Sequence, residues 1–179
     1  MHLTKPVLTG AAVRLRPLVA DDAAAMYASL DDPESMRLTG TQSAFTFEQV
    51  KRHCEHVEHA DDRLDYAIEV ASQPVGEVVL NCVDDINRSA SFRIAIWYND
   101  HRNRGIGTEA TRLLVRHGFD VVGLNRIELE VYSFNPRARR VYENAGFRLE
   151  GTRRQALLWD GEFVDAHTMA MLREDFPVV

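Results

Sequence analysis

The first half of the chain places apolar and polar residues in short alternating runs, which is the pattern of half-buried strands. Residues 13–16 alternate up to Pro17 and predict a short strand. Three further runs with strand character are separated by turn-forming residues and span 65–70, 75–83 and 91–98. Their close spacing predicts an antiparallel meander.

Two helices are predicted between the first strand and this meander, over residues 23–30 and 46–59. Asp21 or Asp22 can cap the first helix, and Pro33 is expected to end it. Thr46 can cap the second helix. The segment between the two helices, which includes Met36, is predicted to be a loop.

In the second half of the chain, the spacing of apolar residues alternates between the period of a helix and the period of a strand. The expected elements are a helix over 108–122, a strand over 126–134, a helix from 135 to 146, a strand from 147 and a last strand over 164–172. Asn135 and Pro136 suit the start of a helix and Gly146 its end. Asp160-Gly161 predicts a hairpin turn.

The resulting order, β-α-α-β-β-β-α-β-α-β-β, predicts an α/β fold with one mixed sheet and helices on both faces. We expect that sheet to be mostly antiparallel, because the meander and the final hairpin supply most of its strands. A length of 179 residues suits a single domain over 1–179.

Composition narrows the classes of function. A formal net charge of −6 argues against broad nucleic-acid binding, which needs clustered cations. No run approaches the roughly 20 apolar residues of a membrane span, and the N-terminus lacks the apolar core of a signal peptide. Cys54 and Cys82 form no CxxC pair, which favours a reduced compartment. A soluble, cytoplasmic protein without a metal is therefore expected.

A glycine-rich loop before the helix over 108–122 carries the candidate chemistry. Gly105 and Gly107 let the backbone approach a ligand closely, and the N–H groups that open a helix attract an anion such as a pyrophosphate. Arg102 and Arg104 add mobile positive charge, and Thr108 can add a hydroxyl. Alternatively, the glycines only turn the chain and cap the helix.

A dinucleotide-binding fingerprint is a second interpretation of the same loop. The spacing Gly105-x-Gly107-x-x-Ala110 fits G-x-G-x-x-G/A, and Glu128 follows about 20 residues later, where that fingerprint places an acid. The loop from Tyr98 is too long for the tight turn of that motif, however, and an antiparallel half precedes it. The fingerprint is therefore the weaker interpretation.

Two motifs in the second half of the chain together resemble those of a known family. The Arg-x-x-Gly-x-Gly motif over 102–107 resembles the R/Q-x-x-G-x-G/A signature of the GNAT acetyltransferase superfamily. The run over 135–147 is similar to its N-x-x-(A/S)-x-x-x-Y/L-E-x-x-G-F segment. The runs over 13–18 and 150–153 resemble the RimJ/RimL-like branch, whose best-known members acetylate ribosomal-protein N-termini. The resemblance covers essentially the whole chain.

The resemblance implies that acetyl-CoA is a co-substrate. Its pyrophosphate would lie on the loop and the helix start, which are Arg102, Asn103, Arg104, Gly105, Ile106, Gly107 and Thr108. The pantetheine arm would pair with the strand end formed by Ile96, Trp97 and Tyr98, beside a splayed neighbouring strand, and with Asn135. Arg140, with Arg137 and Arg139, is a candidate to bind the adenosine phosphate, or else these residues form a plain cationic helix surface.

The implied reaction is direct attack of a neutral amine on the thioester, which requires a base, an acid and an oxyanion donor. Tyr142 is the expected acid for the leaving thiolate, or else a core tyrosine. Glu77 is a candidate base that acts through water, or else a solvated strand residue. His101 is a further proton-transfer candidate or else an exposed loop histidine, and Ser133 can relay a proton or else only end its strand. The backbone near Trp97 is the expected oxyanion donor.

The acceptor is the least determined part of the hypothesis. The branch resemblance favours a protein or peptide N-terminal amine, with polyamines, amino acids and aminoglycosides as alternatives. A non-catalytic acyl-CoA sensor and a nicotinamide-dependent enzyme are the alternatives from other classes. His53, His56 and His59 recur at three-residue spacing, but a solvated helix face explains them better than a metal site. A homodimer is expected only because members of this family commonly form one.

Overall fold

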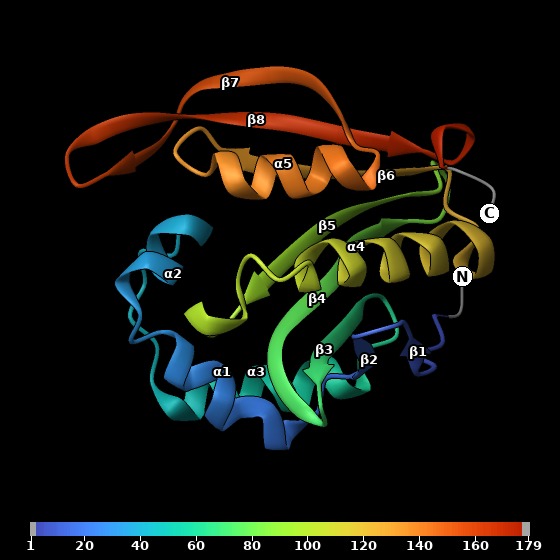
Figure 1. The fold of residues 1–179 in the computed structure, drawn as a ribbon, viewed down its shortest axis with the longest axis horizontal. Helices are drawn as coiled ribbons and strands as arrows, with labels where there is room; N and C mark the ends of the chain where they lie inside the picture. Colours follow the sequence, from blue (N-terminus) through green and yellow to red (C-terminus); the bar gives the residue numbers. More distant parts are fainter. Residues whose placement is uncertain (1–2, 177–179) are drawn as a thin grey trace.

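The computed structural model describes residues 3–176, and its centre is one eight-stranded sheet (Figure 1). The strands are β1 (Leu8–Thr9), β2 (Arg14–Pro17), β3 (Leu64–Val70), β4 (Gln73–Asp84), β5 (Ser89–Ile96), β6 (Arg126–Tyr132), β7 (Arg148–Trp159) and β8 (Glu162–Leu172). Their order across the sheet is β1-β2-β3-β4-β5-β6-β8-β7. Neighbouring strands are antiparallel except β5 and β6, which confirms the predicted mixed, mostly antiparallel sheet.

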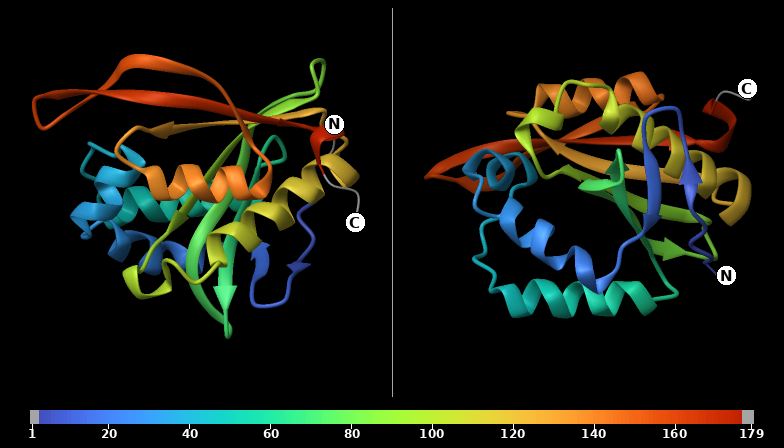
Figure 2. Two further views of the ribbon diagram at one scale, coloured as in Figure 1. Left: turned by 45° about the horizontal axis from the view of Figure 1, so that its top comes forward. Right: turned by 60° about the horizontal axis from the view of Figure 1, so that its bottom comes forward.

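Helices cover both faces of this sheet, as predicted. They are α1 (Ala23–Ser29), α2 (Pro33–Thr39), α3 (Phe47–His59), α4 (Ile106–His117) and α5 (Pro136–Ala145), and α4 continues into a π-helical turn at Gly118–Val122. The right-hand view of Figure 2 shows α4 and α5 on one side of the sheet, with α1 and α3 on the other. None of the helices among residues 3–176 is long and apolar enough to cross a membrane.

The alternation of side chains along each strand produces two apolar cores. Val78 and Leu80 of β4 are fully buried on the α4 and α5 side. Ala67 of β3 and Cys54 of α3 are fully buried in the second, smaller core on the α1 and α3 side. Glu77 directly precedes the buried Val78 of β4 and points to the α1 and α3 side, because successive residues of a strand point to opposite faces.

Several helix ends form where the sequence predicts them. The Thr46 side chain accepts a hydrogen bond from the Gln49 backbone N–H, and the Gln49 side chain accepts one from the Thr46 backbone N–H, so α3 begins with a capping box. Asn135 caps α5 by accepting from the Ala138 N–H at 3.0 Å. Gly146 ends α5 with φ +113°, a conformation that favours glycine.

The prediction was wrong for the segment after α1. Pro33 begins the helix α2 instead of ending a helix, because Asp32 caps it by accepting from the Glu34 N–H at 3.1 Å. Proline is well tolerated at the first helical position, where the backbone N–H has no intrahelical partner. Met36 and Arg37 therefore lie in a helix and not in a loop.

The parallel neighbours β5 and β6 pair over only a short stretch. The paired residues are Ser89–Ser91 with Arg126–Glu128, and beyond them the two strands diverge. The predicted splay is therefore present, and it opens the sheet toward the ends of both strands. On the far side of β6, the β7–β8 hairpin extends past the rest of the sheet (Figure 1) and turns at Asp160-Gly161, as predicted.

Candidate active site

A cleft of about 1190 Å³ occupies the gap between the diverging strands. Its walls come from both sides of the sheet, because no strand fills the space between the ends of β5 and β6. Strand residues, mainly of β4, β5 and β6, form much of the lining, with side chains of α4 and α5 on one side and side chains of α1, α2 and α3 on the other. The cleft thus gives two ligands access to one another through the sheet.

The glycine-rich loop brings the start of α4 to this cleft. Gly105 is the residue before the helix, with φ +79°, and a side chain built there would meet nothing within 4 Å. Gly107 and Thr108 line the cleft in the first turn of α4. The N–H groups of that turn have no intrahelical partner, so they and the helix dipole form an anion site.

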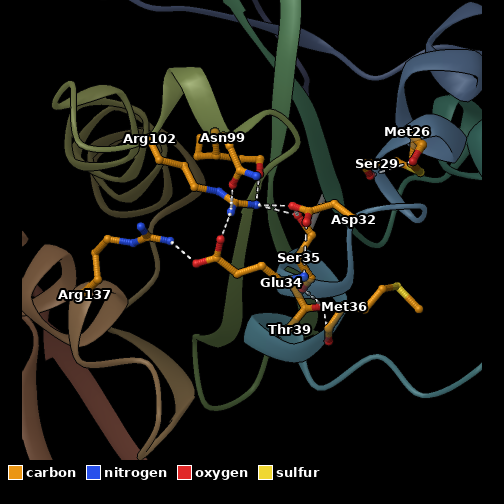
Figure 3. Close-up of polar contacts among 11 residues, drawn as sticks. Met26, Ser29, Asp32, Glu34, Ser35, Met36, Thr39, Asn99, Arg102 and Arg137 are labelled. Atoms are coloured by element: carbon orange, nitrogen blue, oxygen red, sulfur yellow. Dashed lines mark hydrogen bonds and ion pairs between the residues drawn. The ribbon is translucent and has the colours of Figure 1, made fainter.

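The side chain of Arg102 is held in place rather than mobile, which differs from the sequence-based expectation. It is only 8% exposed, and Figure 3 shows it directed toward α2. Its guanidinium contacts the backbone oxygen of Ile96 and the side chains of Asp32, Glu34, Ser35 and Asn99. The positive charge of Arg102 is therefore paired within the protein, because its guanidinium nitrogens lie 3.2 Å from an Asp32 carboxylate oxygen and 3.3 Å from a Glu34 carboxylate oxygen.

The residues of the predicted cofactor set divide into those that line the cleft and those that do not. Those that line the cleft are Ile96, Trp97, Arg102, Asn103, Gly105, Gly107, Thr108 and Asn135. Those outside its lining are Tyr98, Arg104, Ile106 and Arg140. Ile106 is 5% exposed and packs in the larger core, which assigns it a structural position.

The arginine of α5 that lines the cleft is Arg137, and Arg140 is outside the lining. Arg137 lines the cleft and forms an ion pair with Glu34 at 3.6 Å, whereas Arg140 is exposed and lies outside the lining. Arg137 precedes the cleft-lining Val141 by four residues, which places both on one face of the helix. Helical phase could have distinguished the two arginines at the level of sequence.

Asn135 links three elements at the edge of the cleft. It follows β6, it caps α5, and its Nδ2 donates to the Leu38 backbone oxygen of α2 at 3.3 Å. The side chain is 8% exposed. A buried amide that is anchored in this way can present a fixed polar edge to a ligand between β6 and α5.

Tyr142 is a buried phenol on the α5 side of the cleft. Its ring lies edge-to-face with Phe92, at a centroid distance of 6.1 Å, and with Phe147 at 6.0 Å. Burial raises the pKa of Tyr142, so the phenol stays protonated across the physiological range. It therefore both packs in the core and lines the cleft, and its role as an acid stays a prediction.

Glu77 lies on the other side of the cleft and is not a solvated strand residue. Its Oε2 is buried and has no hydrogen-bond partner among the described residues. Burial raises the pKa of Glu77, and the negative charge of Asp65 raises it further, while Arg93 and Arg63 oppose this shift. A carboxylate with a raised pKa at a cleft is a stronger base than an ordinary glutamate, which suits it to accept a proton.

Two histidines line the cleft as well. His53 of α3 lies on the Glu77 side, and burial lowers its pKa. His101 has a buried Nδ1 without a partner among the described residues, so it is less exposed than a typical loop histidine. Among residues 3–176, no cluster of three or more His, Cys, Asp or Glu side chains could hold a metal ion.

The structure places two further candidates away from free positions in the cleft. Ser133 lies outside the main cleft, in a separate hollow of about 500 Å³ beside the β7–β8 turn. The Trp97 backbone N–H donates to the Val75 oxygen at 2.9 Å, so an oxyanion donor from the backbone near Trp97 would have to be a different N–H group. Sequence patterns could not show this pairing, because it depends on the register of β4 and β5.

The splayed strands, the glycine-preceded helix start and the acidic and phenolic groups on opposite walls define an acyl-CoA-dependent N-acetyltransferase. The model of the acetyltransferase (GNAT) domain family matches residues 12–148. The chain belongs to this family, and it uses acetyl-CoA as its co-substrate.

Individual relatives agree with this assignment. The probable N-acetyltransferase YjcK of Bacillus subtilis (strain 168) is 32% identical over 181 residues, which cover 94% of this chain and 98% of the relative. A spermidine N(1)-acetyltransferase of Escherichia coli (strain K12) is 24% identical over 164 residues, covering 92% and 88%. The crystal structure of a spermidine N-acetyltransferase from Vibrio cholerae with CoA and spermine has a TM-score of 0.85 at 23% identity, covering 93% and 98%.

Proposed function

We propose that this N-acetyltransferase acetylates a primary amine of a polyamine such as spermidine. The observation that carries the proposal is the Glu77 carboxylate, whose buried Oε2 has no hydrogen-bond partner among residues 3–176 and which lines the cleft on the side opposite Tyr142. A buried anion of this kind favours a cationic guest. The net charge of −6 also attracts a cation, and two of the relatives described above are spermidine acetyltransferases.

In this proposal acetyl-CoA enters from the α4 and α5 side. Its pyrophosphate binds the free N–H groups around Gly105, Gly107 and Thr108, with Arg137 as the nearby cation. Its pantetheine arm lies between the ends of β5 and β6, beside Ile96 and Asn135. The thioester then reaches the gap between the diverging strands, which is open to both sides of the sheet.

The amine enters from the α1 and α3 side. Glu77 accepts a proton from the ammonium through a water molecule, and the neutral amine attacks the thioester carbonyl carbon. The carbon–sulfur bond breaks as the carbon–nitrogen bond forms. The leaving thiolate takes a proton from Tyr142, and the new ammonium loses its extra proton to solvent. Holding both substrates in one cleft supplies part of the rate acceleration.

Release of CoA thiol from acetyl-CoA across an acceptor panel tests the proposal. The panel contains spermidine, spermine, N-terminal peptides, free amino acids and an aminoglycoside. Turnover with the polyamines above the hydrolysis background supports the proposal. Turnover confined to peptides would instead support the RimJ/RimL-like branch and an N-terminal amine acceptor.

Two binding measurements test the alternative functions that belong to other classes of protein. Acetyl-CoA binding without turnover on any amine would support a sensor, and NADH binding without acetyl-CoA binding would support a nicotinamide-dependent enzyme. The homodimer, the cytoplasmic location and the lack of nucleic-acid binding stay predictions. Sedimentation of the full chain tests the first of these.

A further inference from the structure

The short helix α2 lies between the cofactor loop and the junction of β6 with α5 (Figures 1 and 3). On the loop side, Arg102 contacts Asp32, Glu34 and Ser35 of this segment. On the other side, Asn135 donates to the Leu38 oxygen at 3.3 Å, and Arg37 stacks over the Phe134 ring at 4.5 Å. Contacts from both splayed sides of the sheet therefore hold α2 in place.

The position of α2 depends on these contacts. The helix spans only Pro33–Thr39 and has no fully buried residue, so it lacks an apolar anchor of its own. A helix of this length is not stable by itself in water. Ser35, Met36, Leu38 and Thr39 nevertheless line the cleft, so the shape of the cleft depends on where α2 lies.

Arg102 is the most connected of the residues that hold α2. Its side chain is 8% exposed, and one of its nitrogens, Nη2, lies 3.2 Å from Asp32 and 3.3 Å from the Ile96 oxygen. Burial alone would raise the pKa of Asp32, but hydrogen bonds from Ser35 and the Glu34 N–H, together with the charge of Arg102, lower it. The Asp32 carboxylate thus caps α2 and pairs with Arg102 at the same time.

We propose that Arg102 is a positioning residue, which holds α2 against the cofactor loop so that α2 completes the wall of the cleft. In this role its guanidinium forms ion pairs with Asp32 and Glu34 and does not bind the diphosphate of acetyl-CoA. The proposal rests on the acetyl transfer proposed above. Because Arg102 also touches the Ile96 oxygen, the loop, the end of β5 and α2 are joined at one point.

Two acetyl donors distinguish this role from direct contact with the cofactor. Acetyl-CoA carries the diphosphate, whereas acetyl-pantetheine has the same thioester and arm without it. We expect Arg102→Gln to lower kcat/KM by a similar factor, about tenfold, with both donors, and to raise the KM for the amine. A loss confined to acetyl-CoA would mean that Arg102 binds the diphosphate, and it would overturn the proposal.

Hydrogen exchange provides a readout that does not depend on turnover. Arg102→Gln is expected to speed amide exchange in the peptide over 33–40, and Asp32→Asn should do the same, since asparagine keeps the helix cap but removes the charge. The double variant should add little to either single change. Lys51→Gln on α3, which removes only an exposed i,i+4 partner of Glu55, is the control and should change nothing.

Unchanged exchange over 33–40 in the Arg102 variant would contradict the proposal whatever the activity shows. If the wild-type protein acetylates no polyamine, the proposed acceptor fails, but faster exchange in the variant would still support the positioning role. The two proposals can therefore fail separately.

Discussion

Glu77 and Tyr142 line one cleft from opposite faces of the same sheet. Glu77 projects from β4 on the side of α1 and α3, and Tyr142 projects from α5 on the other side. They share a space only because β5 and β6 stop pairing after Ser91 and Glu128. The divergence of two neighbouring strands thus places the proposed proton acceptor and the proposed proton donor on two sides of one cleft.

Replacement of Glu77 by glutamine should remove the base without changing the shape of the side chain. We expect kcat/KM for the amine to fall by about 10² or more, the usual range for a general base. Wild-type activity should fall as the pH drops through the raised pKa of Glu77, and that limb of the profile should be lost in Glu77→Gln. An identical pH profile for the two proteins would rule out Glu77 as the base.

The same substitution should have an effect on stability that depends on pH. Because the folded protein raises the pKa of Glu77 above its ordinary 4.5, the folded state binds the proton more tightly than the unfolded state does. The wild-type protein therefore loses stability as the pH rises from that value through the folded pKa. Urea titrations at pH 4.5 and pH 8 should show Glu77→Gln gaining stability over the wild type at the higher pH. An equal difference at both pH values would contradict the assigned shift.

Removal of the Tyr142 hydroxyl tests the proposed acid. Tyr142→Phe keeps the ring that packs against Phe92 and Phe147, so its thermal stability should stay close to that of the wild type. We expect kcat to fall by about 10² with acetyl-CoA. The deficit should shrink with an acetyl thioester whose thiol has a lower pKa, because such a leaving group needs less protonation. A deficit that is the same for both donors would argue against an acid role.

The loop glycine can be tested against a matched glycine elsewhere. Gly105 and Gly161 have φ +79° and +82°, and a side chain at either position would meet nothing within 4 Å. Alanine at either site should cost roughly 1–2 kcal/mol of backbone strain. Only Gly105→Ala should weaken acetyl-CoA binding in calorimetry, because Gly161 lies in the turn between β7 and β8. Equal weakening by both variants would place the cofactor elsewhere.

Most of the fold follows from local signals in the sequence. The Asn135-Pro136 start and the Gly146 end of α5 are fixed by backbone groups within the segment itself, and the structure agrees with both. The same holds for the Asp160-Gly161 turn. The failure at Pro33 has an equally local cause, since a proline that can end one helix can also begin the next when an aspartate precedes it.

The site was harder to predict because its residues are defined by tertiary contacts. Nothing in the sequence near Arg102 indicates that its partners lie in α2, some 70 residues earlier. The pairing of the Trp97 amide with Val75 depends on strand register. The burial of Glu77 likewise depends on α1 and α3 packing over the strand, so sequence alone could not decide between a solvated carboxylate and a buried base.

Mass spectrometry of the products formed from acetyl-CoA and spermidine would show whether this protein acetylates a polyamine. We expect monoacetylated spermidine in an amount equal to the CoA thiol released, and a large loss of both in Glu77→Gln. Tight acetyl-CoA binding with no acetylated polyamine, or CoA release without any acetylated amine, would contradict the claim that this cleft delivers an acetyl group to a polyamine.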